Sequence, residues 1–116
     1  MPNYITIDLV QGQSYSNTFY TTGANGSYIN ISGFSARGGI KNKFSETGYV
    51  LNLNPSVDTS YISGAVNVIL SGYMTSGLKV GMSVFDIESY QSGSSGDGLV
   101  YKTAMGYIKV YPEISI

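Results

Sequence analysis

The chain has 116 residues, no cysteine, no histidine, a charged fraction of only 11% and a formal net charge of −1. This composition excludes disulfides and thiolate chemistry, and it excludes Ser–His and Cys–His nucleophilic arrangements. Only three of the six basic residues cluster along the sequence, so the basic stripe of a nucleic-acid-binding protein is missing. The length predicts one domain, residues 1–116, that is large enough to bury a core.

The start of the chain lacks the basic and apolar runs of a secretory signal. No stretch approaches the roughly 20 apolar residues of a membrane span. We therefore expect a protein that folds in a cytoplasm and has no membrane partner.

Short runs of β-branched and aromatic residues predict strands along the whole chain. Fifteen glycines weaken every long helical window. The expected strands are residues 4–9, 14–20, 28–31, 34–43, 49–53, 64–70, 82–88 and 99–115. Their number and spacing favour a sandwich or barrel with one continuous core.

Two local features modify this pattern. Gly38-Gly39 interrupts the fourth expected strand, and such a pair predicts either a bulge or a close approach of another backbone. Residues 75–79 form the single candidate for a helical turn, with Thr75 as its cap.

The strands nearest the chain ends, residues 4–9 and 107–114, are candidate sheet edges. Asp8 and Lys109 are charges within these strands, and an edge with few charges can accept a strand from a neighbour. The alternative is that these two strands pair with each other or with inner strands.

Asp86 and Glu88 lie two residues apart on one expected strand, so their side chains face the same side. They could form the carboxylate pair of an inverting glycosidase, or bind Ca²⁺ together with Asp97. We prefer the interpretation that they are sheet-pairing polar residues, with Arg37 and Asp86 forming an ion pair across the sheet. We therefore predict no catalytic residue, no metal and no cofactor.

Residues 92–98 are rich in glycine and serine but contain no lysine and open no helix. They lack the parts of a phosphate-binding loop. We interpret them as a hairpin tip or as a loop that contacts a partner.

Six short motifs occur in a distinctive order. They are Gln11-Gly12, Ile31-Ser32-Gly33-Phe34-Ser35-Ala36-Arg37, residues 64–70, Thr75 to Gly81 with Leu78, Phe85-Asp86-Ile87-Glu88, and Gly106 to Ser115. In this order they resemble the small immunoglobulin-like module of tailed-phage virion proteins, which occurs as a free-standing structural protein and at the N-termini of baseplate or fibre proteins. The resemblance covers nearly the whole chain and departs from the family at Met82-Ser83 and in the long tip at 92–98.

The resemblance implies an all-β fold, a single immunoglobulin-like antiparallel β-sandwich of seven or eight short strands with at most one helical turn near 75–79. It also implies assembly rather than catalysis. The expected function is that of a virion structural component, assembled in the host cytoplasm, which docks in multiple symmetric copies on neighbouring tail, baseplate, neck or capsid proteins.

We expect the partner contacts at exposed strand ends and loop tips, at Tyr4, Tyr90, Ser94, Ser95, Asp97, Tyr111 and Ile116. The alternative is a carbohydrate- or receptor-binding sandwich whose surface tyrosines stack on sugar rings. The absence of tryptophan counts against that alternative. An enzyme comes third, supported by Asp86 and Glu88 alone.

Overall fold

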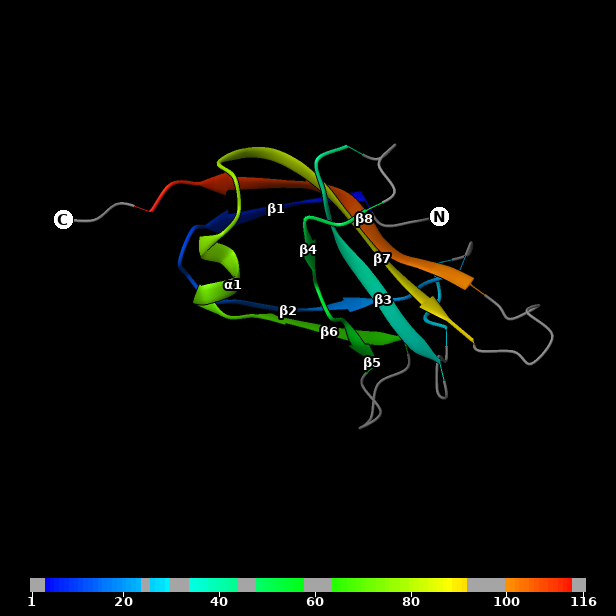
Figure 1. Cartoon of the computed structure of the whole chain (residues 1–116). Helices are drawn as coiled ribbons and strands as arrows, with labels where there is room; N and C mark the ends of the chain where they lie inside the picture. Colours follow the sequence, from blue (N-terminus) through cyan, green and yellow to red (C-terminus); the bar gives the residue numbers. More distant parts are fainter. Residues whose placement is uncertain are drawn as a thin grey trace.

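The computed structural model describes residues 4–23, 26–29, 34–43, 48–57, 64–91 and 100–113. Its elements are β1 (Tyr4–Val10), β2 (Tyr15–Tyr20), β3 (Ser35–Lys41), β4 (Leu51–Asn52), β5 (Ser56–Val57), β6 (Ala65–Leu70), α1 (Gly72–Ser76), β7 (Gly81–Tyr90) and β8 (Val100–Tyr111). The strands form a five-stranded sheet in the order β1-β8-β7-β3-β4 and a three-stranded sheet in the order β2-β6-β5 (Figure 1). The expectation of an all-β sandwich is confirmed.

The strand order is that of an immunoglobulin-like sandwich. Strands β3, β7 and β8 take the places of C, F and G, and β2, β6 and β5 those of B, E and D. The sandwich is not purely antiparallel, however, because β1 runs parallel to β8. The turn at Gln11-Gly12 carries the chain from β1 into the other sheet, so β1 meets the last strand instead of folding back on β2.

The two sheets meet in one apolar core. Phe19 of β2 and Phe85 of β7 contact each other across the sandwich, with ring centroids 6.2 Å apart. In antibody domains the corresponding strands carry the disulfide that joins the sheets. Since this chain has no cysteine, an aromatic pair makes the connection there.

The glycine pair in β3 marks a close approach and not a bulge. The β3–β7 ladder runs without a register shift. A Cβ atom on Gly38 would overlap the Asp86 carbonyl, and one on Gly39 would overlap the ring of Tyr49. Of the two readings of Gly38-Gly39, close approach is therefore the correct one.

The irregularity of the sheet lies instead between β7 and β8. Ile87 pairs with Ala104 whereas Glu88 pairs with Lys102, so Thr103 is the extra residue of a bulge. Thr103 and Ala104 are both fully buried as a result.

The bulge completes a buried triangle of hydroxyl groups. Thr103 Oγ1 lies 2.7 Å from Ser89 Oγ and 2.9 Å from Thr21 Oγ1, and Thr21 Oγ1 lies 3.3 Å from Ser89 Oγ. Thr21 follows β2 of the small sheet, while the other two belong to the large sheet. The triangle therefore ties the two sheets together by polar contacts inside the core.

We expect Thr103→Val to lower the free energy of unfolding by about 1–3 kcal/mol, because it removes a hydroxyl from buried partners at nearly constant volume. Urea denaturation measures the loss. The matched control is Thr6→Val on the exposed face of β1, which should change stability by less than about 0.5 kcal/mol. Equal effects of the two substitutions would contradict a stabilising triangle.

The helical turn forms earlier than expected. It spans Gly72–Ser76, and Ser71, not Thr75, is its cap, with the Ser71 Oγ accepting from the Met74 N–H at 3.2 Å. Thr75 is buried, and its hydroxyl donates to the Gln13 carbonyl at 2.9 Å. The Thr75 side chain, predicted from the local sequence to cap the helix, instead makes a hydrogen bond to a residue distant in sequence.

The strand expectations differ from the structure mainly between the long strands. The stretch 49–53 is reduced to the two residues of β4, and β5 follows directly after Pro55. In the expected strand 28–31, Tyr28 makes an isolated bridge with Thr22, and residues 30–31 lie outside the described part of the chain. In these short segments the sequence has little alternation of apolar and polar residues. Their length in the structure is therefore set by the strands with which they pair.

Candidate functional site

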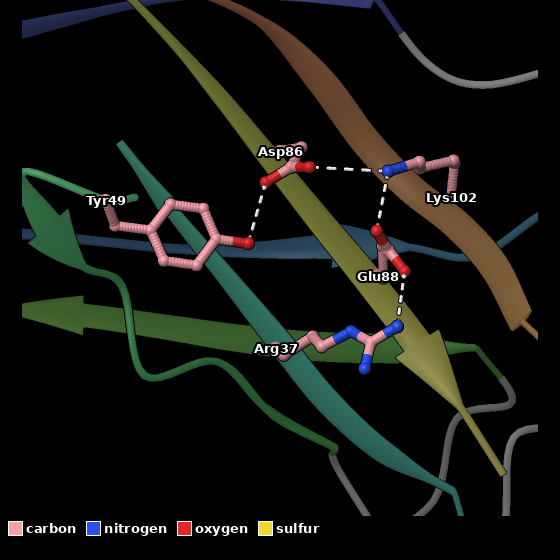
Figure 2. A network of polar contacts seen from close by, with 5 residues as sticks. All are labelled: Arg37, Tyr49, Asp86, Glu88 and Lys102. Carbon is pink, nitrogen blue, oxygen red and sulfur yellow. Dashed lines mark hydrogen bonds and ion pairs between the residues drawn. The ribbon is translucent and has the colours of Figure 1, made fainter. Parts of the chain in front are cut away.

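A network of polar side chains covers part of the outer face of the five-stranded sheet. β7 buries its odd-numbered residues from Ser83 to Ser89 and turns Asp86 and Glu88 outward. Figure 2 shows these two carboxylates between Arg37 of β3, Lys102 of β8 and Tyr49, which precedes β4. Four segments of the large sheet thus contribute to one cluster.

Glu88 is the centre of this network. Its Oε2 lies 3.0 Å from the Arg37 Nη2, and its Oε1 lies 2.7 Å from the Lys102 Nζ. Lys102 also reaches the Asp86 Oδ2 at 3.3 Å, and the Tyr49 hydroxyl donates to the Asp86 Oδ1 at 3.3 Å. Each carboxylate therefore has two partners.

The predicted ion pair between Arg37 and Asp86 is wrong. In the β3–β7 register Arg37 lies opposite Glu88, whereas Asp86 lies opposite Gly39. Arg37 therefore pairs with Glu88, and Asp86 pairs with Lys102. The two strands and the face were predicted correctly. The predicted partner of Arg37 is two residues away, along β7, from the actual partner Glu88.

The contacts in the network favour the charged forms of Glu88 and Lys102. Burial raises the pKa of Glu88, but hydrogen bonds from Lys102 and Arg37 outweigh burial and leave that pKa below its usual value. Burial lowers the pKa of Lys102, and its bonds to Glu88 and Asp86 turn the net shift upward. A general acid of a glycosidase needs a raised pKa, so the shift at Glu88 is in the wrong direction for that role.

We expect Glu88→Gln to lower the melting temperature by a few degrees at pH 7, because it removes the charge from two partly exposed ion pairs worth about 0.2–1 kcal/mol each. The folded pKa of Glu88 is lowered from 4.5, so its contribution is complete above that value and is lost as the pH falls through the folded pKa. Melting curves of both proteins between pH 7 and pH 3 should therefore converge at the acidic end. A difference that stays constant over this range would contradict the assignment.

The Ca²⁺ alternative receives no support from the described residues. Among them, no group of three acidic side chains is placed to hold a metal ion. Asp97, the third ligand considered, lies outside the described part of the chain.

Three of the seven expected contact residues lie in the described structure. Tyr4, at the start of β1, is 67% exposed. The Tyr90 ring lies under the Arg37 guanidinium, 4.5 Å from its centroid, and the Tyr111 ring lies 5.1 Å from the Lys109 Nζ. The other four, Ser94, Ser95, Asp97 and Ile116, lie outside the described residues.

Two apolar residues on the outer face of the five-stranded sheet were not predicted from the sequence. Tyr107 of β8 is 48% exposed and Met82 of β7 is 59% exposed. Tyr107 is opposite Thr6 and Val84 in the ladders, and Met82 is opposite Lys109. We call Tyr4, Met82, Tyr107 and Tyr111 the tyrosine face. The alternation of β8 contained the signal, because residues 107, 109 and 111 share one side of the strand.

The small sheet carries a shallow groove of about 650 Å³ on its outer side. There the Thr18 hydroxyl donates to the Asn67 Oδ1 at 2.7 Å, and the Tyr20 ring stacks on Tyr28 with centroids 5.2 Å apart. None of the described residues that line the groove is charged; they are Ser16, Asn17, Thr18, Tyr20, Ser56, Asn67, Val68 and Ile69.

No protein-family model matches this chain, and no curated protein sequence matches it. Over the described residues, none of the helical structure has the length and apolar character needed to span a bilayer. The class of protein that the fold defines is an all-β sandwich.

Proposed function

We propose that this chain is a structural component of a tailed-phage virion that docks in multiple copies on neighbouring tail, baseplate, neck or capsid proteins. The ordered motifs from Gln11-Gly12 to Gly106–Ser115 suggest the family, and the immunoglobulin-like strand order is compatible with it. The observation that carries a docking function is the tyrosine face. It offers aromatic and thioether side chains of the kinds enriched at protein interfaces.

The surroundings of the tyrosine face favour a protein partner. Arg37 and Lys102 pair with Glu88 in the polar network. Lys109 covers the Tyr111 ring, and Asp8 is a further, exposed charge on this face. A partner therefore meets tyrosine rings and aliphatic stems with little unbalanced charge to desolvate. Many copies of a modest contact of this kind give a stable assembly through avidity.

Detection of the chain in purified particles tests the proposal. Mass spectrometry of virions, banded by density and treated with protease to remove adhering proteins, should find the chain at a fixed ratio to the capsid and tail proteins. Its presence in infected cells but not in particles would contradict the proposal.

The tyrosine face should determine incorporation. Tyr107→Ala, supplied in trans to a phage that lacks the gene, should reduce the chain's abundance in particles. Tyr73→Ala is the matched control, because Tyr73 is 90% exposed but belongs to α1. Equal incorporation of both variants would assign docking to another surface.

The second candidate is binding of a neutral glycan, favoured by the groove beside the Tyr20–Tyr28 stack, whose described lining residues are uncharged. Amides, hydroxyls and a tyrosine are groups that pair with sugar hydroxyls and ring faces. A glycan array that gives a hit with the wild type and with Tyr107→Ala, but not with Thr18→Ala, would support this candidate. A blank array would count against it.

A further inference from the structure

The free side of β1 has the properties of a strand-pairing edge. Within the described part of the chain, β1 pairs with β8 alone and ends the five-stranded sheet. Just after the strand, the Gln11 N–H donates to the Tyr111 carbonyl of β8 at 3.0 Å. Since backbone groups alternate in direction along a strand, the odd-numbered residues of β1 direct theirs to β8.

The even-numbered residues therefore direct their N–H and C=O groups away from β8. The Val10 carbonyl agrees with this direction, because it accepts from the Gln13 N–H in the turn at 3.1 Å. Thr6 and Asp8 lie in the middle of the strand, and their backbone N–H and C=O groups also point away from β8. A second strand could bond to their backbones without displacing β8.

This edge lacks most of the usual protection against pairing. Natural edges are shortened, bulged, or carry proline and several charges. β1 is seven residues long, its ladder with β8 has no register shift, and its sequence Tyr4–Val10 contains no proline and one charge, Asp8. Such an edge accepts another strand readily.

We propose that the occupant is a second copy of this chain, with the two β1 strands antiparallel and centred on Ile7. The backbone directions require pairs between even-numbered residues, and this register places Thr6 opposite Asp8 and Tyr4 opposite Val10. All seven residues of β1 are then paired. Tyr4 and Val10 are both exposed and apolar in the single chain, so their contact buries two apolar side chains.

The sequence of β1 favours the centred register over the two registers that are shifted by one pair. A shift by one pair in one direction would place the two Asp8 carboxylates opposite each other on the same face, which is unfavourable. A shift in the other direction would place Val10 opposite Pro2, which has no N–H to donate to the ladder. The centred register instead gives each Asp8 a Thr6 hydroxyl as neighbour, with Lys109 on its other side in the β1–β8 ladder.

The pairing would join two five-stranded sheets into one continuous sheet about a twofold axis. The tyrosine faces of both copies would then lie on the same side. This inference deepens the proposed function and rests on it only for the idea of symmetric assembly. The pairing itself is tested on the isolated protein. Particle analysis and self-association can therefore fail independently.

Cysteine pairing tests the register, since the natural chain has no cysteine. Mixing Thr6→Cys with Asp8→Cys under mild oxidation should give a disulfide-linked dimer, because directly opposed residues have Cα atoms about 5.5 Å apart, within disulfide range. Thr6→Cys alone, which keeps the Asp8 charge, should give little dimer, because the two identical residues would be diagonal in the centred register. A dimer formed equally by Thr6→Cys alone would overturn the register.

Proline tests the edge itself. Thr6→Pro removes an N–H that points away from β8, a position where an edge strand tolerates proline. Sedimentation should show dimers for the wild type and for the control Thr6→Ala, and monomers for Thr6→Pro with an unchanged circular dichroism spectrum. A wild type that stays monomeric at all accessible concentrations, or a folded Thr6→Pro protein that still dimerises, would overturn the proposal.

Discussion

Gly106→Ala is expected to unfold the protein or to detach β1 from it, with a loss of more than about 3 kcal/mol. Gly106 has φ of +153°, and a Cβ atom there would overlap the Ile5 carbonyl oxygen of β1. The overlapping atom belongs to backbone within the β1–β8 ladder, so no side chain can move aside. Guanidinium denaturation and circular dichroism measure the effect.

Two further alanine substitutions separate the two causes. Gly81 also has a positive φ, +123°, but a Cβ atom there meets open space, and Gly77 has neither a positive φ nor a close neighbour. Gly77→Ala should change stability little, and Gly81→Ala should lose about 1–2 kcal/mol through backbone strain alone. If Gly106→Ala matched Gly81→Ala, the contact with Ile5 would have no part in the effect.

Phe85→Ala should lower the free energy of unfolding by about 3–5 kcal/mol, a large part of the 5–15 kcal/mol typical of a domain. Phe85 is 1% exposed and pairs with Ile40 and Gly106 in the two adjoining ladders. Its ring also meets Phe19 of the other sheet. Removing it leaves a cavity at the point where the sheets are joined, and urea denaturation measures the loss.

The Phe19–Phe85 contact can be isolated from simple loss of volume. A double-mutant cycle with Phe19→Leu and Phe85→Leu should give a coupling of about 0.5–1.5 kcal/mol. Ile69→Ala is the control, since Ile69 is 73% exposed on the outer side of β6. Additive effects of the two leucine substitutions would contradict a specific aromatic connection between the sheets.

The long strands could be predicted because their own residues alternate. β1, β2, β6 and the two long strands of the hairpin β7–β8 were all expected within a few residues of their bounds. A local alternation fixes which face of a strand is buried. It does not fix direction or order, so the parallel pairing of β1 with β8 was one of several open arrangements.

The candidate site required register, which the sequence does not contain. Parity placed Asp86 and Glu88 on one face, and the predicted ion pair added Arg37 to that face; Figure 2 shows all three side chains there. Which carboxylate meets Arg37 depends on how β3 slides along β7, and a slide of two residues preserves parity. Lys102 was missed because the bulge at Thr103 changes the parity of β8 between Lys102 and Tyr107.

The parallel ladder between β1 and β8 also sets the order in which the fold can be completed. It joins Ile5 to Gly106, so a ribosome making 5–20 residues per second needs roughly 5–20 seconds after β1 before its partner exists. During that time the side of β1 that pairs with β8 in the folded chain has no partner. Contacts this distant in sequence also slow the folding of β-proteins. The nascent chain therefore presents the same self-complementary strand to other nascent chains, and polysomes are the place where premature association should begin.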